Sequence, residues 1–307
     1  MTERVDVAVV GAGPAGAAAA AACARAGVSV TLIEGVAVGG EALNIEEPVE
    51  LPARHPLPGP DLAAALIADV LEEGVDLRLG GQATAVGRAD GVWRVATRDG
   101  ELHARALLLC TGSEFVPLPN RLPVEEDPLY GRGLFTCATC DSPLYSQKRV
   151  AVAGGGDTGV GAALTLSRYA AEVVLYEREA ALTAHPALTD ALARVPNVEL
   201  RLRAEVTDAQ GESTLSAVRV VDRGTAATEP ADGLMLAVGL RPRSQLVAEL
   251  VERDRNGAIR VDRDLAASAS GIFAAGDVRE GAAYRCAAAW EDGLAAARGA
   301  LALFGAV

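Results

Sequence analysis

The pattern of apolar and polar positions predicts strands and helices that alternate along the chain. Residues 5–10 have the apolar pattern of a strand, and a glycine-rich turn follows at residues 11–16. An alanine-rich helix comes next, and residues 28–33 are predicted as a second strand that ends in Glu34. This order of strand, turn, helix and strand predicts a βαβ unit.

The same pattern is repeated later in the chain. A strand at residues 150–153, a glycine turn at 154–159, a helix to residue 167 and a strand at 173–176 lead to Glu177. The distance from the first glycine of the turn to the acid is 23 positions in both copies, from Gly11 to Glu34 and from Gly154 to Glu177. The repeat predicts an α/β fold with two Rossmann-like three-layer dinucleotide-binding domains.

The segments between the two units predict how the domains are connected. Residues 45–60 are rich in proline and acidic residues and are expected to form a loop, and residues 61–73 a helix. Residues 77–109 alternate like an antiparallel meander. Apolar runs end just before Thr111-Gly112 and at Val238-Gly239, where we expect the chain to cross between domains. The predicted domains are residues 1–113 with 240–307, and an inserted domain at 114–239.

Composition narrows the class of protein. A length of 307 residues suits two domains, and a net charge of −13 provides no basic surface for nucleic acid or for an anionic membrane. No apolar run reaches the roughly 18 residues that a membrane span needs. Five cysteines, an odd number without a secretory signal, argue against a structural disulfide framework. We therefore expect a cytoplasmic protein in which any disulfide is catalytic.

The first glycine turn has the features of a dinucleotide-binding site. Gly11 permits a tight turn, Gly13 lets the backbone approach a pyrophosphate, and Gly16 lets helix and strand pack closely. Glu34 is then placed to accept hydrogen bonds from a ribose. A flexible turn without a ligand is the alternative, which the surrounding strand, helix and spaced acid disfavour.

Two such turns in one chain are typical of a flavin site and a nicotinamide site. The segment Gly271 to Asp277 is predicted as an apolar strand followed by the carboxylate of Asp277, which can bind ribityl hydroxyls. Because it is assigned to the domain that contains Gly11, it indicates that the flavin belongs there.

The segment Cys137-Ala138-Thr139-Cys140 places two thiols one helical turn apart, close enough to form a disulfide. A position at the start of a helix would favour the thiolate. Half of a zinc site and two buried cysteines are the alternatives. No second C-x-x-C is present and the three histidines are scattered, so we expect no metal site.

These motifs stand in the order found in low-molecular-weight thioredoxin reductases, a family that the sequence resembles over nearly its whole length. The resemblance implies an FAD-binding domain at 1–113 and 240–307, a nicotinamide-type domain at 114–239, and a homodimer. It also implies a thioredoxin or thioredoxin-like partner, or a small dithiol or disulfide. By resemblance, Cys140 faces the flavin, Cys137 exchanges with the substrate, and Asp141 carries a proton. A role for Asp141 as a helix cap is the alternative.

The resemblance also assigns cofactor-binding residues. For FAD these are Gly11, Gly13, Pro14, Ala15, Gly16, Glu34, Gly40, Thr111, Gly112, Gly276, Asp277, Arg285, Cys286 and Ala287. For the nicotinamide they are Gly154, Gly156, Asp157, Thr158, Gly159, Glu177 and Arg178. The segment Arg285-Cys286-Ala287 departs from the family's Arg-Gln-Ala at Cys286. The cysteine could be a neutral replacement, a residue that tunes the flavin, or a third thiol.

The nucleotide motif departs from the family more strongly. Members that use NADPH carry His-Arg-Arg and a further arginine, whereas this chain has Tyr176-Glu177-Arg178-Glu179 and then Thr183. The two acids would repel a 2′-phosphate, and Glu177 suits a free ribose hydroxyl. We therefore expect NADH rather than NADPH.

Other functions on the same scaffold stay open. The inserted site could have lost its nucleotide, with electrons arriving from ferredoxin or leaving to oxygen in a dithiol oxidase that forms a disulfide in a small molecule. A non-catalytic flavoprotein that senses redox state is a third hypothesis, which the set of two cysteines and Asp141 disfavours.

Overall fold

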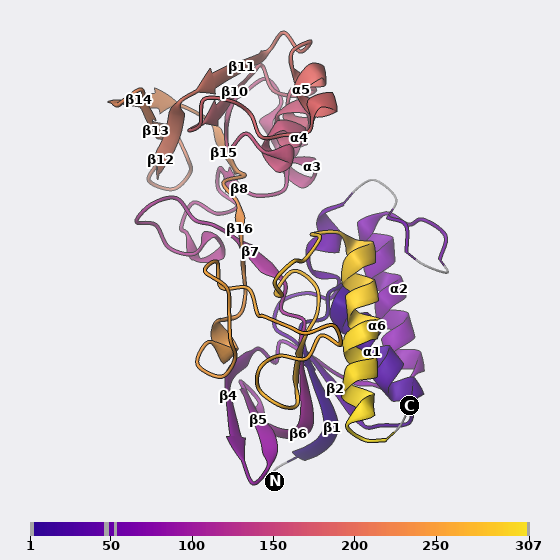
Figure 1. Ribbon diagram of the computed structural model, residues 1–307. Helices are drawn as coiled ribbons and strands as arrows, with labels where there is room; N and C mark the ends of the chain where they lie inside the picture. Colours follow the sequence, from indigo (N-terminus) through magenta and orange to yellow (C-terminus); the bar gives the residue numbers. More distant parts are fainter. Residues whose placement is uncertain (1–2, 46–48, 52–53, 306–307) are drawn as a thin grey trace. The chain divides into compact units, whose positions relative to one another are not determined.

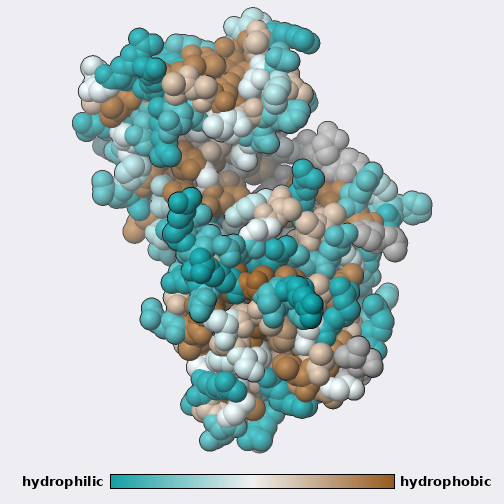
Figure 2. All heavy atoms as spheres, viewed as in Figure 1, coloured by the Kyte–Doolittle hydropathy of each residue, from teal (hydrophilic) through white to brown (hydrophobic). Residues whose placement is uncertain are grey.

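The computed structural model describes residues 3–45, 49–51 and 54–305, so the predicted loop at 45–60 lies partly outside the described residues. The chain divides into two compact units, Met1–Glu114 with Arg241–Val307, and Phe115–Leu240. These divisions lie one residue from the predicted domain boundaries. On the face seen in Figure 2, hydrophilic residues cover much of the surface and smaller apolar areas lie between them.

The first unit is built on one mixed sheet with the strand order β3-β2-β1-β6-β5-β4, and β17 pairs with β6 outside this path. Strands β1, β2, β3, β6 and β17 run parallel to one another, and β5 is antiparallel to both of its neighbours, β6 and β4. The strands are β1 Glu3–Val10, β2 Val30–Glu34, β3 Asp76–Leu79, β4 Ala83–Ala89, β5 Val92–Thr97, β6 Gly100–Leu109 and β17 Ile272–Ala274.

The predicted meander at residues 77–109 is wrong at its first strand. Strand β3 pairs in parallel with β2, at the far side of the sheet from β4 and β5. The reason is the helix that precedes β3, because a helical crossover returns the chain to the same end of the sheet and extends it with a parallel strand. Residues 83–109 do form the antiparallel meander.

Helices α1 (Pro14–Arg25), α2 (Gly59–Glu72) and α6 (Cys286–Ala302) lie side by side against this sheet (Figure 1). Small residues allow α1 and α6 to approach closely: a Cβ on Gly293 would overlap the carbonyl oxygen of Ala15. This contact brings the C-terminal helix to the first glycine turn.

The second unit has three layers. Its parallel sheet has the order β11-β10-β9-β15-β8, with helices on one face and the three-stranded antiparallel sheet β12-β13-β14 packed against the other. The strands are β8 Leu134–Phe135, β9 Arg149–Ala153, β10 Glu172–Glu177, β11 Val198–Leu202, β12 Ala204–Gln210, β13 Ala217–Asp222, β14 Thr225–Pro230 and β15 Gly233–Leu236. The helices are α3 Ala138–Asp141, α4 Asp157–Leu166 and α5 Pro186–Leu192.

The chain crosses between the units twice, through β7 (Ser113–Phe115) and β16 (Leu240–Pro242), which pair with each other. Short 3₁₀ helices complete the fold, η1 Gly40–Asn44, η2 Val124–Glu126, η3 Ser142–Tyr145 and η4 Gln245–Val247. The predicted α/β fold class, with two Rossmann-like units, is confirmed. Among the described residues, no helix has the length and apolar composition needed to cross a membrane.

Candidate functional site

The first glycine turn joins β1 to α1, and each of its glycines meets a different constraint. Gly11 has φ of 99°, and a Cβ there would overlap the carbonyl oxygen of Cys110. A Cβ on Gly16 would overlap the carbonyl oxygen of Gly11. Beside Gly13, in contrast, the nearest atom to such a Cβ is the carbonyl oxygen of Gly39, 4.0 Å away. The start of α1, where Pro14 is the first residue, therefore has room for a phosphate.

Glu34, at the end of β2, is tied to this turn. Its Oε2 accepts a hydrogen bond from the backbone N–H of Ala12 at 2.8 Å, and its Oε1 accepts one from Val36 at 2.8 Å. Each carboxylate oxygen can accept a second bond, so these contacts orient the acid and leave acceptor capacity for a ribose hydroxyl.

The C-terminal segment completes the first site. Strand β17 pairs with β6, and a Cβ on Gly276 would lie 3.1 Å from the Cβ of Ala15, so Gly276 lies directly beside the first glycine turn. Burial, together with the negative charges of Glu41 and Asp292, raises the pKa of Asp277 to about 6. Within the described residues, no hydrogen bond from another group reaches this half-buried carboxylate. A polyol such as the ribityl chain of FAD would satisfy it, and with the open space at Gly13 these residues fit FAD.

Asp292 is a site residue that the sequence did not reveal. It accepts a hydrogen bond from the backbone N–H of Gly276 at 3.1 Å and two from Arg279 at 2.6 and 2.7 Å. It holds the loop that carries Asp277. One acid in an alanine-rich helix gave no signal for this role, which depends on where α6 packs.

Other residues assigned to FAD are placed around these two segments. Gly40, with φ of 53°, lies against Gly13. The hydroxyl of Thr111 donates to the carbonyl oxygen of Arg243 at 2.6 Å, and the carbonyl oxygen of Gly112 accepts from the Arg243 N–H. The Thr111 hydroxyl thus links the two segments next to the points where the chain crosses between the units.

The N-terminus of α6 carries the Arg285-Cys286-Ala287 segment. Arg285 is the N-cap residue and makes no side-chain capping bond, and Cys286 and Ala287 begin the helix. Burial and the negative charge of Asp277 raise the pKa of the Cys286 thiol. A thiol that stays protonated is a poor nucleophile, which favours the neutral replacement over a third reactive thiol.

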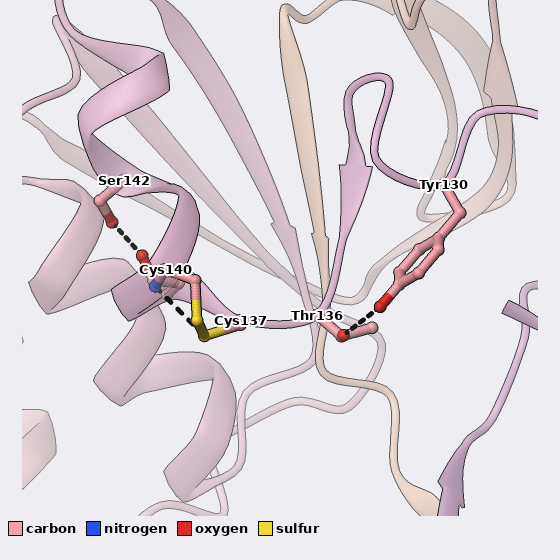
Figure 3. Close-up of a disulfide and its surroundings, with 6 residues drawn as sticks. Tyr130, Thr136, Cys137, Cys140 and Ser142 are labelled. Atoms are coloured by element: carbon pink, nitrogen blue, oxygen red, sulfur yellow. Dashed lines mark hydrogen bonds between the residues drawn. A yellow bond between two sulfur atoms is a disulfide. The ribbon is translucent and has the colours of Figure 1, made fainter. Parts of the chain in front are cut away.

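The two cysteines of the C-x-x-C segment form a disulfide in the second unit (Figure 3). Cys137 is the N-cap residue of α3, and its Sγ accepts a hydrogen bond from the backbone N–H of Cys140 at 3.1 Å. The helix has only four residues, so this N–H is a more direct source of thiolate stabilisation than the helix dipole that the sequence suggested. Cys23 and Cys110 are buried, and burial raises the pKa of Cys23 to about 12.

Asp141 ends α3, directly after Cys140. Its side chain makes no capping hydrogen bond to η3, which argues against the helix-cap alternative. Burial raises the pKa of the Asp141 carboxyl, and its charge contributes, after burial, to raising the pKa of Tyr145 to about 12. A carboxyl that protonates more readily than usual suits a proton carrier.

The second glycine turn has the geometry of the first. A Cβ on Gly154 would overlap the carbonyl oxygen of Ala237, and one on Gly159 would overlap that of Gly154. Beside Gly156, the nearest atom to such a Cβ is Oγ1 of Thr183, 3.7 Å away. Asp157 and Thr158 are exposed on the first turn of α4.

The loop after β10 closes over this turn. The N–H of Thr183 donates to the carbonyl oxygen of Gly155 at 3.0 Å, and Oδ1 of Asp157 accepts from the N–H of His185 at 2.6 Å. Thr183 therefore lies beside the position that a dinucleotide pyrophosphate would take. The Thr183 hydroxyl is therefore a candidate contact for the pyrophosphate. In the sequence, this position was notable only because it lacks the arginine of the family.

Glu177 and its neighbours set the charge at the end of β10. Glu177 is 7% exposed, and its two oxygens accept hydrogen bonds from the N–H groups of Gly155 at 2.6 Å and Glu179 at 2.8 Å. The side chains of Arg178 and Glu179 are 71% and 64% exposed and lie 3.4 Å apart. Arg203, which the sequence analysis did not single out, is next to this segment in the structure, because its backbone N–H donates to the carbonyl oxygen of Glu179.

Across the described ranges, no three histidine, cysteine or acidic side chains come together in a group that could hold a metal ion. The sulfurs of Cys137 and Cys140 are joined to each other.

Two glycine turns of the dinucleotide-binding type and a cysteine pair in one chain are the combination expected of a disulfide oxidoreductase. The family model described as pyridine nucleotide-disulphide oxidoreductase matches residues 5–293, and the chain belongs to this family. It is thus an enzyme, an oxidoreductase acting on sulfur groups, and the resemblance to low-molecular-weight thioredoxin reductases is confirmed. The family implies FAD and a nicotinamide cofactor.

Known proteins show the same likeness. Thioredoxin reductase of Treponema pallidum is 33% identical over 298 residues, which are 96% of this chain and 95% of that protein. Thioredoxin reductase of Streptomyces coelicolor is 32% identical over 286 residues, which are 91% of this chain and 87% of that protein. The crystal structure of T. acidophilum thioredoxin reductase has a TM-score of 0.85 at 28% identity and covers 98% of this chain and 99% of its own.

Proposed function

We propose that this enzyme passes electrons from NADH through FAD to the Cys137–Cys140 pair, and from that pair to the disulfide of a thioredoxin-like protein. The observation that carries the proposal is the disulfide next to Asp141, a carboxyl that burial makes easier to protonate. A redox pair with a proton carrier in the same turn is what thiol–disulfide exchange needs.

The first unit is the proposed FAD domain. Gly13 and the start of α1 would hold the pyrophosphate, Glu34 the ribose, and Asp277 the ribityl hydroxyls, with the N-terminus of α6 close by. Bound FAD would supply a two-electron carrier between the nucleotide and the dithiol. Asp292 keeps the Asp277 loop in place by its bonds to Gly276 and Arg279.

At the dithiol, we assign Cys140 to receive the electron pair and Cys137 to exchange with the substrate, as the resemblance implies. The N–H of Cys140, which bonds to Sγ of Cys137, favours negative charge on that sulfur. The Cys137 thiolate attacks the substrate disulfide, and Asp141 gives a proton to the thiolate that leaves. Attack by Cys140 on the mixed disulfide then releases the reduced substrate and re-forms the disulfide of the enzyme.

We propose NADH as the donor because the end of β10 carries acids where a 2′-phosphate would need cations. Glu177 is fixed by Gly155 and Glu179, so it cannot swing away from a phosphate, and it is suited to accept from ribose hydroxyls. Arg178 is largely exposed, and its positive charge is paired with the carboxylate of Glu179.

A thioredoxin-like partner is favoured because relatives of this length are named thioredoxin reductases. The proposal includes a homodimer, as the resemblance implies, and a cytoplasmic location, as the composition of the sequence suggests. Sedimentation of the purified protein would test the dimer.

The test adds NADH or NADPH to the purified flavoprotein without oxygen and follows the loss of the flavin's visible absorption by stopped flow. We expect rapid loss with NADH, slow loss with NADPH, and turnover once a thioredoxin and its disulfide are present. Cys137→Ser should keep the reduction of the flavin and lose that of thioredoxin. No reduction by either nucleotide would refute the NADH route and favour a ferredoxin-linked reductase or a dithiol oxidase.

A further inference from the structure

Ser142 lies at the end of the dithiol turn, where α3 passes into η3, and its side chain is fully buried. Its hydroxyl donates to the carbonyl oxygen of Ala138, and its backbone N–H donates to the same oxygen. Ala138 stands between the two cysteines in the sequence. Figure 3 shows the Ser142 hydroxyl directed back into the turn that carries them. The turn is thus held by these two bonds and by a third, from the backbone N–H of Asp141 to the carbonyl oxygen of Cys137 at 3.2 Å, none of which involves sulfur.

A second link closes the same segment at its ends. The rings of Phe135, two residues before Cys137, and Tyr145, five residues after Cys140, stack with centroids 4.7 Å apart. Both rings are buried. The ring stack fixes where the segment begins and ends, and the Ser142 bonds fix the turn within it.

We propose that Ser142 is a positioning residue that keeps the dithiol turn formed when the disulfide is open. Reduction breaks the Sγ–Sγ bond and adds two electrons and two protons, giving two thiols and removing the covalent link between Cys137 and Cys140. A four-residue helix is far too short to persist by its own propensity. In the reduced enzyme, therefore, the bonds from Ser142 to Ala138, together with the backbone bond from Asp141 to Cys137, hold the thiols one turn apart and keep the Cys140 N–H near Sγ of Cys137.

The inference rests on the proposed function and makes a directional claim. In the oxidised enzyme the disulfide restrains the turn, so loss of the hydroxyl costs the oxidised form less than the reduced form. Ser142→Ala should therefore favour the disulfide. The net value of one buried hydrogen bond corresponds to a shift of about three- to tenfold in the equilibrium. For a two-electron couple this is about 14 to 30 mV toward a more negative potential.

The test equilibrates the intact flavoprotein with dithiothreitol buffers of defined ratio, without oxygen or nucleotide. The free thiols are then alkylated, and the peptide that contains Cys137 and Cys140 is quantified by mass spectrometry. Ser167→Ala is the matched control, because the Ser167 hydroxyl also donates to a backbone carbonyl oxygen, that of Leu164, but at the end of α4 and outside the dithiol turn. We expect a shift of at least about threefold for Ser142→Ala and less than about twofold for the control.

Equal midpoints for Ser142→Ala and the wild type would overturn the inference and leave the proposed function intact. A wild-type pair that is not reduced reversibly would overturn the proposed function, and the inference with it. Thermal unfolding of the oxidised and reduced forms gives a second readout. Ser142→Ala should lower the melting temperature of the reduced form more than that of the oxidised form. An equal decrease in both forms would show a structural role only.

Discussion

The carboxylate of Glu177 accepts a hydrogen bond from the backbone N–H of Gly155 at 2.6 Å, at the entrance to the second glycine turn. Glu34 stands in the same relation to Ala12, at 2.8 Å, in the first unit. The two copies therefore share a tertiary contact as well as a spacing in the sequence. In both, the acid at the end of the second strand is held beside the turn, where a ribose hydroxyl can reach it.

The exposed charge at Glu179 offers a test of nucleotide preference that leaves Glu177 in place. Glu179→Lys removes an acid from the end of β10 and releases Arg178 from its partner. We expect kcat/KM for NADPH to rise about tenfold and that for NADH to change less than about threefold, with a smaller effect at high salt.

Glu212→Lys, in the exposed turn between β12 and β13, controls for the change in net charge. An equal rise for both nucleotides, or the same rise in the control, would show that residue 179 acts by general attraction and not on a 2′-phosphate.

Two glycines of the first turn should respond differently to alanine. Gly13→Ala meets no protein atom closer than 4.0 Å, so the melting temperature of the apoprotein should hardly change, while FAD binding weakens by about tenfold or more because the methyl group fills the phosphate position. Gly16→Ala would overlap the Gly11 carbonyl oxygen and should destabilise the apoprotein by about 1–3 kcal/mol or more. Flavin titration and thermal unfolding separate the two, and tight FAD binding by Gly13→Ala would contradict the assignment.

Asp141→Asn tests proton transfer and the cap alternative together. Loss of the acid should lower turnover with a disulfide substrate by about 10²–10⁴-fold and leave reduction of the flavin unchanged. Burial raises the pKa of this carboxyl above 3.8, so the ionised form destabilises the fold. Asn should therefore stabilise the protein at pH 7–8 and have no such effect below the unfolded pKa. A loss of stability at pH 8 would indicate a structural cap.

Asp277→Asn should separate stability from cofactor binding. The pKa of Asp277 is about 6 in the fold and 3.8 when unfolded, so its ionisation penalises the apoprotein increasingly between these values and fully above pH 6. The variant apoprotein should be more stable than the wild type by roughly 1–3 kcal/mol at pH 7 and equal to it below pH 3.8. FAD affinity should fall about ten- to hundredfold as a charged acceptor is lost. Chemical unfolding and flavin titration measure both, and undiminished affinity would refute the ribityl contact.

Local patterns predicted most of the secondary structure, because each pattern has a local cause. The apolar run at 5–10, the glycines at 11–16 and the alanine-rich helix correspond to β1, the turn and α1, and the second copy corresponds to β9, α4 and β10. The error at β3 arose because alternation identifies a strand and not its partner. Residues 76–79 pair in parallel with β2 only because α2 returns the chain to that edge.

By itself, the sequence determined two dinucleotide-binding turns, a cysteine pair one helical turn apart and an acid beside it, because glycine spacing and thiol spacing act within a few residues. Tertiary structure alone decided that Asp292 holds the Asp277 loop, that Thr183 lies over the second glycine turn, and that Asp141 is buried enough to raise its pKa. These features depend on packing between segments distant in the chain, and burial and long-range contacts exist only after the units have folded.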